Sequence, residues 1–353
     1  MYTPRFTITS QINSQIADIE AQRILIERSK ILPSKEIVLR KRASIEATRS
    51  STGIEGNPLT MHEVELVLSG QKIAASERFV MEVVNYKKSL EYIEKRSKEN
   101  IPIAVRDALS VHAIAMNNLL QQKKIGLLRK TPIYIVDIFN RKEIMRYEGP
   151  DSKNVRTLLD DLFSWMKQIQ GKLHPLLIAG IFHYEFVSIH PFADGNGRVT
   201  RLLTLMYLYQ CGYGFRNILV PDSYYFSDRK RYYSALSNAK QYVRQTKADL
   251  TSWLEYFVEG MHQVVFDLSR KVSLVSLPEN THDLVTLSEE DYQIIEFITS
   301  VQKADIEAIE TVIRMPKRTV QRKLQRLVQV GVLARIGKGP ATVYQLRKGK
   351  EHE

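Results

Sequence analysis

The sequence contains a single cysteine, Cys211, among 353 residues. One thiol cannot form an internal disulfide, so a secreted fold held together by disulfides is excluded and a reducing compartment is expected. Apolar runs are interrupted by polar side chains well before membrane-spanning length. The first residues, MYTPRFTITSQINSQ, lack the basic and then apolar pattern of a signal peptide. We therefore expect a cytoplasmic protein without a membrane partner.

Acidic residues are scarce relative to basic ones. The chain has 39 Asp and Glu against 51 Lys and Arg, which gives a formal net charge of +12. Such a charge attracts acidic partners at long range. Nucleic acids, nucleotides and acidic proteins all remain open on this ground.

Helical spacing of apolar residues dominates the first three quarters of the chain. One segment differs: residues 131–150, TPIYIVDIFNRKEIMRYEGP, have β-branched and aromatic runs on both sides of a polar centre, which predicts a β-hairpin. The expected helices are 11–31, 34–50, 60–69, 76–98, 101–122, 152–170, 174–189, 198–211, 228–245 and 248–270.

A second pattern begins after residues 271–287, KVSLVSLPENTHDLVTL, which are typical of a linker. Ser288 and Asp291 have the spacing of a capping box before a helix. Two further helices and a hairpin around Lys338-Gly339-Pro340 follow. Three helices and a β wing predict a winged helix-turn-helix domain at 288–353.

The stretch IHPFADGNGRVTR, residues 189–201, concentrates chemistry-bearing side chains between two apolar helices. Gly195 and Gly197 on either side of Asn196 let the backbone turn so that several N–H groups point into one concavity at a helix N-terminus, an arrangement that binds anions. Arg198 and Arg201 are three residues apart and lie on one helix face, where both guanidinium groups can reach the same oxyanion.

Two neighbouring residues extend this interpretation. Asp194 would repel a phosphate unless a cation such as Mg²⁺ bridged them. His190 titrates near working pH and can accept a proton from an attacking hydroxyl. Taken singly, a histidine, a tight turn and a basic helix face are each more often structural. Their combination predicts phosphoryl or nucleotidyl transfer.

HPFADGNGRVTR resembles, without a departure, the HxFx(D/E)GNGRxxR signature of the Fic proteins. The resemblance extends over about residues 35–260, with the hairpin where Fic proteins carry their flap. It implies a mainly α fold, a Fic helical core with a β-hairpin flap, here followed by the small winged helix-turn-helix domain. The expected division is an N-terminal helical region with an inhibitory motif at 1–100, the catalytic core at 101–270, the linker at 271–287 and the winged-helix domain at 288–353.

The resemblance also implies an activity, the transfer of AMP from ATP to a protein hydroxyl with Mg²⁺. His190 would deprotonate the Ser, Thr or Tyr of the target, and Asp194 would hold the metal. The α- and β-phosphates would lie against Gly195, Asn196 and Gly197. The arginines would bind the outer phosphates, Arg198 the β-phosphate and Arg201 the γ-phosphate. The intact Gly-Asn-Gly step favours AMP as the transferred group.

Residues 50–57, SSTGIEGN, have the composition of a helix end. Ser51 to Gly56 also resemble the inhibitory [S/T]xxxE[G/N] motif of Fic proteins. That resemblance implies that Glu55 pairs with Arg201, bidentately on our expectation, and misaligns bound ATP. In some relatives the same glutamate helps to remove AMP again.

Three further sets of residues are weaker candidates. Flap residues Ile135, Val136, Asp137 and Ile138 could dock a target segment as an added strand. Tyr233 lies in an Arg-Tyr-Tyr run that resembles the segment lining the adenine site. Helix 317–330 has basic residues that could neutralise DNA phosphates: Lys317, Arg318, Arg322, Lys323 and Arg326.

Two hypotheses therefore stand. The first is a self-inhibited adenylyltransferase, with homodimers a weak expectation. The second is a DNA-binding transcriptional regulator whose Fic-like core senses nucleotide. The intact His190, Asp194, Arg198 and Arg201 favour the enzyme.

Overall fold

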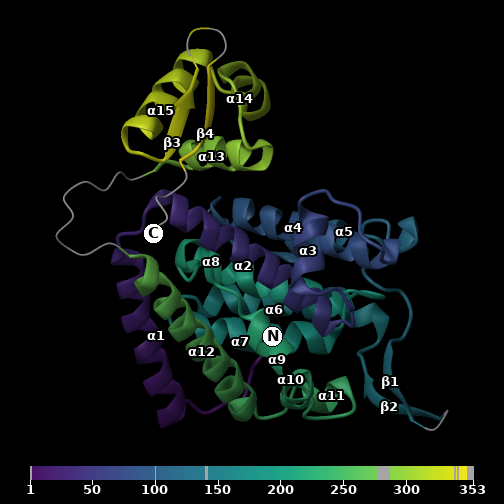
Figure 1. The fold of residues 1–353 in the computed structure, drawn as a ribbon. Coiled ribbons are helices and arrows are strands. Elements are labelled where there is room, and N and C mark those ends of the chain that lie inside the picture. The colour runs from purple at the N-terminus through teal and green to yellow at the C-terminus, as the bar shows by residue number, and fades with distance from the viewer. Residues whose placement is uncertain are drawn as a thin grey trace. The chain divides into compact units, whose positions relative to one another are not determined.

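The structure, a computed structural model, describes residues 2–99, 101–139, 142–276, 287–337, 339 and 342–347. The chain divides into two compact units (Figure 1). Residues 1–27 and 42–270 form the first, and residues 28–41 and 271–353 form the second. Within the described residues, no helix combines the length and apolar character needed to cross a bilayer.

Helices make up almost all of the first unit. Their bounds are α1 Ser10–Arg28, α2 Pro33–Ile54, α3 Met61–Leu68, α4 Glu77–Ser97, α5 Val105–Ala115, α6 Val155–Ile169, α7 Pro175–Ile189, α8 Asn196–Gln210, α9 Asp222–Ser227, α10 Arg229–Leu236, α11 Tyr242–Gln245 and α12 Thr251–Val275. Short 3₁₀ turns lie at Gln122–Lys124, Ser152–Asn154 and Phe215–Asn217. The mainly α class is as predicted, and α2 and α12 each continue into residues of the second unit.

Helix α7 forms the centre of the first unit. Its sequence, PLLIAGIFHYEFVSI, is apolar on every side, and 13 of its 15 residues are buried. A helix of that kind has to be covered all round. Helices α6 and α8 pack against it, and α8 in turn packs on α4 and α5. The core thus fixes the C-terminus of α7 and the N-terminus of α8, which the motif connects.

Several helix bounds differ from the prediction. Helix α2 continues to Ile54 instead of ending at residue 50. The helix expected over 101–122 covers only Val105–Ala115. The single helix expected over 228–245 is wrong, because the Gln245 side chain accepts hydrogen bonds from the N–H groups of Asn238 and Ala239, which diverts this backbone from helical pairing. Helix α12 runs to Val275, five residues into the expected linker, of which 277–286 lie outside the described residues.

The predicted hairpin consists of β1 Tyr134–Phe139 and β2 Lys142–Glu148, which pair antiparallel with an irregularity between Ile135 and Val136. Figure 1 shows it extending from the helices of the first unit. Tyr147 anchors its base, since its ring is buried and its hydroxyl donates to the Ser188 carbonyl near the end of α7. Asn140 and Arg141, at the centre of the predicted turn, lie outside the described residues.

The second unit contains α13 Glu289–Val301, α14 Ile306–Ile313, α15 Lys317–Gln329, β3 Leu333–Ile336 and β4 Val343–Leu346, the last two paired antiparallel. This order of elements is the expected one. The capping box of Ser288 and Asp291 is confirmed at the start of α13. The start of α2 also belongs to this unit: Ile37 packs against its apolar core, and the Arg40 guanidinium lies 4.4 Å from the centroid of the Tyr292 ring.

Candidate active site

The motif forms a tight connection between α7 and α8. His190 caps α7 in the left-handed conformation, with φ 51°, and Gly195 precedes α8 with φ 79°. The Asn196 side chain closes the turn, because its Oδ1 accepts from the Phe192 N–H at 2.8 Å and its Nδ2 donates to the Phe192 carbonyl at 2.9 Å. Phe192 is fully buried. The side chain of Asn196 therefore shapes the loop, while the Gly195 N–H donates to Asp194 Oδ1 at 2.6 Å.

His190 is oriented as a proton acceptor requires. Its Nδ1 lies 3.1 Å from the Val187 carbonyl, which can only accept, so Nδ1 carries the hydrogen and Nε2 has the free lone pair. Burial lowers the pKa of His190 below its ordinary value, although the Val187 carbonyl opposes this shift. The imidazole is thus neutral at neutral pH.

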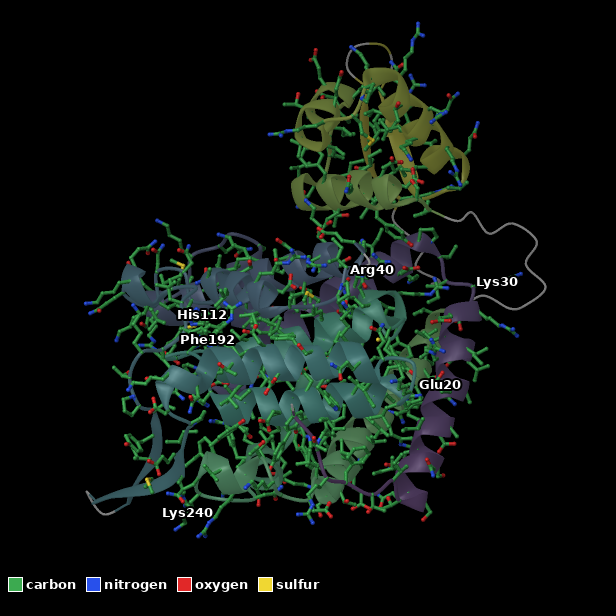
Figure 2. The ribbon with its side chains drawn as sticks, turned by 180° about the vertical axis from the view of Figure 1, so that it is seen from behind. Glu20, Lys30, Arg40, His112, Phe192 and Lys240 are labelled. Atoms are coloured by element: carbon green, nitrogen blue, oxygen red, sulfur yellow. The ribbon has the colours of Figure 1, made fainter. Side chains whose placement is uncertain are left out.

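His112, which the sequence analysis missed, supports the motif from α5. Its ring stacks on Phe192 with centroids 4.0 Å apart, and Figure 2 shows the two side by side. Nδ1 accepts from the Gly126 N–H at 2.9 Å, so Nε2 donates to the Asp194 carbonyl at 3.2 Å. Burial lowers the pKa of His112 to about 4, which keeps it neutral. A lone histidine in an apolar helix gives no sequence signal for this role.

Arg198 is a buried cation whose donors are incompletely used. Its side chain is 4% exposed and lies 3.7 Å from Asp194 Oδ1 and 3.8 Å from Glu82 Oε1, both too far for a strong hydrogen bond. Nε and Nη1 are buried without a hydrogen-bond partner among the described residues. Leaving such donors unpaired costs about 1–3 kcal/mol each. The arrangement therefore favours an anion as ligand.

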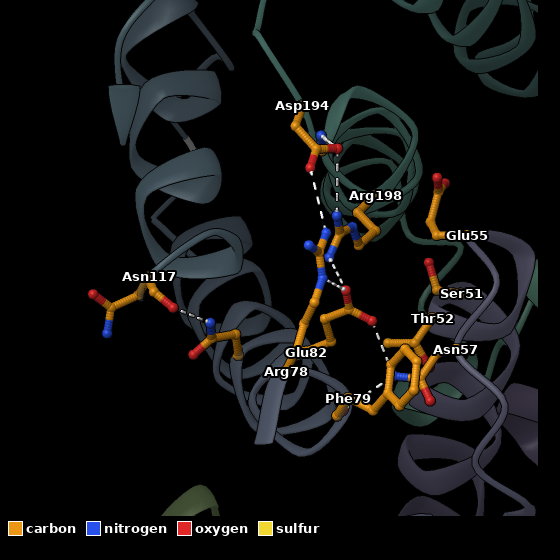
Figure 3. A network of polar contacts seen from close by, with 12 residues as sticks. Ser51, Thr52, Glu55, Asn57, Arg78, Phe79, Glu82, Asn117, Asp194 and Arg198 are labelled. Atoms are coloured by element: carbon orange, nitrogen blue, oxygen red, sulfur yellow. Dashed lines mark hydrogen bonds and ion pairs between the residues drawn. The ribbon is translucent and has the colours of Figure 1, made fainter. Parts of the chain in front are cut away.

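Glu82 and Arg78 on α4 join this cluster, and neither was predicted. Glu82 Oε2 accepts from Asn57 Nδ2 at 3.0 Å, while Arg78 lies 3.4 Å from Glu82 Oε1 and 3.9 Å from Asp194 Oδ2 (Figure 3). Glu82 thereby links the segment that follows α2 to the arginine of the motif. Nothing in the spacing of the sequence connects these positions.

Arg201 is held by the end of α2. Its Nε donates to Ser51 Oγ at 2.8 Å, and its Nη2 donates to the Ser51 carbonyl at 3.0 Å and to Glu55 Oε1 at 2.8 Å. The expected bidentate pair is therefore corrected: one carboxylate oxygen binds the guanidinium, and Ser51 takes the second position. The extension of α2 to Ile54 explains this, because it places Ser51 one helical turn before Glu55.

The Glu55 carboxylate lies directly over the glycine turn. A Cβ built on Gly197 would approach Glu55 Oε1 to less than 3.0 Å, closer than real Cβ atoms come. Burial alone would raise the pKa of Glu55, but Arg201 and Arg198 outweigh it and hold that pKa below its ordinary value. An ionised carboxylate thus lies against the backbone of Gly197.

A second carboxylate, that of Asp222, lies close to Arg201 Nε. Asp222 at the start of α9 is buried, accepts from the Tyr86 hydroxyl at 2.7 Å, and has Oδ2 3.8 Å from Arg201 Nε. Burial raises the pKa of Asp222, and Arg201 opposes that shift. The sequence analysis did not identify Asp222 or Tyr86.

The remaining candidates fall at the margins of the site. Tyr233 is 46% exposed, and its hydroxyl donates to the Ile54 carbonyl at 3.3 Å, so it lies beside the C-terminal end of α2. On the flap, Ile135 and Val136 are 40% and 41% exposed, while the side chains of Asp137 and Ile138 lie outside the described residues.

The basic residues of α15 divide into two groups. Lys317, Arg318, Arg322 and Arg326 are exposed. Lys323 is buried, and its Nζ binds Asp291 Oδ1 at 3.1 Å and Ser288 Oγ at 2.8 Å. Its charge is therefore used inside the second unit, which removes it from the candidate DNA-binding residues.

Part of the chain is similar to known proteins. Residues 102–208 match the Fic/DOC family. The chain is 24% identical over 231 residues to the protein adenylyltransferase Fic of Drosophila willistoni, covering 64% of this chain and 43% of that protein, and 27% identical over 206 residues to that of Drosophila grimshawi, covering 57% and 39%. The chain thus spans about two fifths of the length of these relatives.

Solved structures show the same fold. A Fic family protein from Desulfovibrio desulfuricans aligns over 100% of both chains with a TM-score of 0.65 at 24% identity. Fic-1 of Caenorhabditis elegans aligns over 74% of this chain and 72% of that one, with a TM-score of 0.57 at 21% identity. His190, the glycine turn and both arginines therefore lie within the segment that matches the Fic/DOC family, and the solved structures share the fold around them.

Proposed function

We propose that this chain transfers AMP from ATP to the hydroxyl of a Ser, Thr or Tyr side chain of a target protein, itself included, and that Glu55 restrains the reaction. The main support for this proposal comes from Arg198. It is a buried guanidinium with two unpaired donors, beside a glycine turn at a helix N-terminus and a neutral histidine. Buried donors of this kind match phosphate oxygens.

The triphosphate would lie along the start of α8. The amides of Gly195, Asn196 and Gly197 would receive the α- and β-phosphates, and Arg198 and Arg201 would contact the β- and γ-phosphates. Both guanidinium groups are fixed by burial before ATP arrives. Preorganised donors stabilise the charge that develops on the leaving pyrophosphate without further reorganisation.

Asp194 is the residue that would hold Mg²⁺. Its carboxylate is 43% exposed and lies next to Arg198, so it can face both solvent and the phosphates. One protein carboxylate with phosphate oxygens is a usual Mg²⁺ environment. The ion would neutralise phosphate charge during transfer.

The chemical step then depends on His190. Its Nε2 would take the proton of the target hydroxyl while that oxygen attacks the α-phosphorus. A new O–P bond forms, the bond from the α-phosphorus to the bridging oxygen breaks, and pyrophosphate leaves. A neutral imidazole is the form able to accept this proton.

Glu55 would oppose this alignment. Its carboxylate takes one Nη2 position on Arg201 and covers Gly197, where phosphate oxygens would otherwise approach. ATP that binds beside it would place its α-phosphate away from the line of attack. The exposed Ile135 and Val136 on β1 would present a strand edge to the target segment.

The test follows labelled AMP from ATP onto protein in the presence of Mg²⁺. Glu55→Gly should label itself or a mixture of proteins, and Glu55→Gly with His190→Ala should not. Glu55→Gly with His62→Ala is the matched control, since His62 is exposed on α3 and touches none of these groups. Labelling that persists without His190 would refute the proposed mechanism.

A second candidate function concerns the second unit. The exposed residues of α15 are all basic or glutamine, namely Lys317, Arg318, Gln321, Arg322, Gln325, Arg326 and Gln329. Arginine and glutamine are the side chains that read guanine and adenine in the major groove. We propose duplex DNA as a partner, tested by fluorescence anisotropy with labelled duplexes. Arg322→Gln should weaken binding, and unchanged affinity would refute it. A homodimer remains a prediction.

A further inference from the structure

Arg129 is a buried cation between the flap and the motif, and it has no role in the reaction proposed above. The residue is 5% exposed. Its Nε donates to the His190 carbonyl at 2.8 Å, and its Nη2 reaches the Ile189 carbonyl at 3.4 Å. Its own N–H donates to the Pro191 carbonyl at 2.9 Å. Three successive residues of the motif are thus bound to it.

The same guanidinium also binds both ends of the hairpin. Nη1 donates to the Thr131 carbonyl at 2.9 Å, before β1, and Nη2 donates to the Pro150 carbonyl at 2.6 Å, after β2. Within the described part of the chain, the hydrogen bonds of the Arg129 side chain all go to main-chain carbonyls. A planar fork with five donors can serve separate carbonyls at once, which an ammonium group cannot do in fixed directions.

The backbone that Arg129 holds at His190 is strained. A non-glycine residue at φ 51° occupies a sparsely populated conformation that costs of order 1–3 kcal/mol and persists only where its surroundings enforce it. The carbonyls of Ile189 and His190 are at the C-terminus of α7, where a cation is electrostatically favourable. Arg129 thus stabilises the conformation that directs the imidazole into the site.

We propose that Arg129 is a positioning residue that couples the seating of the flap to the orientation of His190. Because one rigid group binds both legs of the hairpin and the carbonyl of the base, displacement of either end transmits to the other. A target strand that docks on β1 would therefore also fix the imidazole that takes its proton. This inference rests on the proposed function for its catalytic meaning, but its structural core can be measured separately.

Amide hydrogen exchange tests the coupling without reference to activity. Arg129→Gln should accelerate exchange about tenfold or more in peptides covering both the flap base and residues 187–193, since hydrogen bonds to a charged group contribute about 1.5–3 kcal/mol and 1.4 kcal/mol is a factor of ten. Arg129→Lys, which keeps the charge and loses the fork, should accelerate the same two regions to a smaller degree. If Arg129→Gln does not fold, Arg129→Lys still tests the coupling.

Arg96→Gln is the matched control. Arg96 is also buried, and its Nε binds Asp107 Oδ1 at 2.8 Å, away from the motif. Its loss should reduce thermal stability without selective acceleration at residues 187–193. Acceleration at the flap base alone, at the motif alone or at neither after the Arg129 substitutions would overturn the coupling.

An activity measurement adds the catalytic part. On the Glu55→Gly background, Arg129→Lys should lower kcat for AMP transfer about tenfold, while KM for ATP stays within about twofold, because Arg129 is not placed at the phosphates. A rise in KM with kcat unchanged would refute the positioning role. If Glu55→Gly itself transfers no AMP, the proposed function fails, and the exchange result still decides the coupling.

Discussion

Glu55→Gly removes one acceptor from a guanidinium that has several. Arg201 keeps the Ser51 hydroxyl and carbonyl, and Asp222 remains 3.8 Å from its Nε. The buried charge of Arg201 therefore keeps these partners, and the substitution should leave the fold intact. Glu55 itself lies just after the last helical residue of α2, where glycine is readily tolerated.

The size of the effect follows from the contact that is lost. A hydrogen bond between charged groups contributes about 1.5–3 kcal/mol, and a difference of that size is about 10–150-fold in an equilibrium or a rate. The carboxylate also covers Gly197, so the substitution opens space beside this glycine and removes a negative charge. We expect AMP transfer by Glu55→Gly to exceed that of the unmodified chain by a factor in the upper part of this range.

The assay is the initial rate of label incorporation at several ATP concentrations. Glu55→Gln serves as the control, because it preserves the size of the side chain and removes its charge. If charge competition with phosphate dominates, the glutamine variant should recover much of the gain. If the carboxylate acts mainly by occupying space, it should recover little.

Equal rates for the unmodified chain and Glu55→Gly, with both proteins folded and binding ATP, would refute the inhibitory role. Ser51→Ala gives an independent measure. It removes the Nε acceptor while Glu55 stays, and it should raise the rate less than Glu55→Gly. A larger effect at Ser51 would mean that the helix end, and not the carboxylate, restrains the site.

The other predictions concern the base, the turn and the second unit. The rate of Glu55→Gly should fall at low pH with a midpoint below about pH 6.5, since the base must be neutral and burial lowers the pKa of His190 below its ordinary value; a midpoint above pH 7 in a pH–rate profile would contradict this. Gly195→Ala should abolish ATP binding measured by calorimetry, because φ is 79° there and a Cβ would meet the Met116 Sδ at under 3.0 Å; normal affinity would refute the need for this backbone. Lys323→Met should lower the free energy of unfolding of the second unit by about 1–3 kcal/mol, since buried Asp291 loses its 3.1 Å ion pair and keeps the Ser288 hydrogen bonds and Arg326 Nη1 at 3.8 Å, whereas Arg322→Gln should leave stability unchanged in chemical denaturation.

The sequence was sufficient for the helical class, the hairpin and the motif, since each depends on local spacing. The apolar surface of residues 174–189 predicts a buried helix, and the two glycines predict the turn after it. Glu55 was predicted through the resemblance of residues 51–56 to the inhibitory motif of Fic proteins. The capping box of Ser288 was visible for the same reason.

Residues that act through tertiary contacts could not be found in this way. His112 and Glu82 lie on α5 and α4, far from the motif in sequence, and their partners are backbone or single side chains that have no pattern. The expectation for Lys323 was wrong about exposure because the acid that binds it belongs to a different helix. The prediction of a bidentate pair between Glu55 and Arg201 was wrong because residues 51–54, which were expected to lie outside the helix, form an extra turn of α2.

Glu55 lies close to the backbone of Gly197, and this limits which substitutions could remove the proposed inhibition by Glu55. Any side chain at 197 would expel the carboxylate, but it would equally obstruct a phosphate at the same amide. No substitution at that position can therefore separate restraint from catalysis. If Glu55 restrains the site as proposed, substitutions that change only the resting rate are expected on the α2 side of the contact, among residues 51–55.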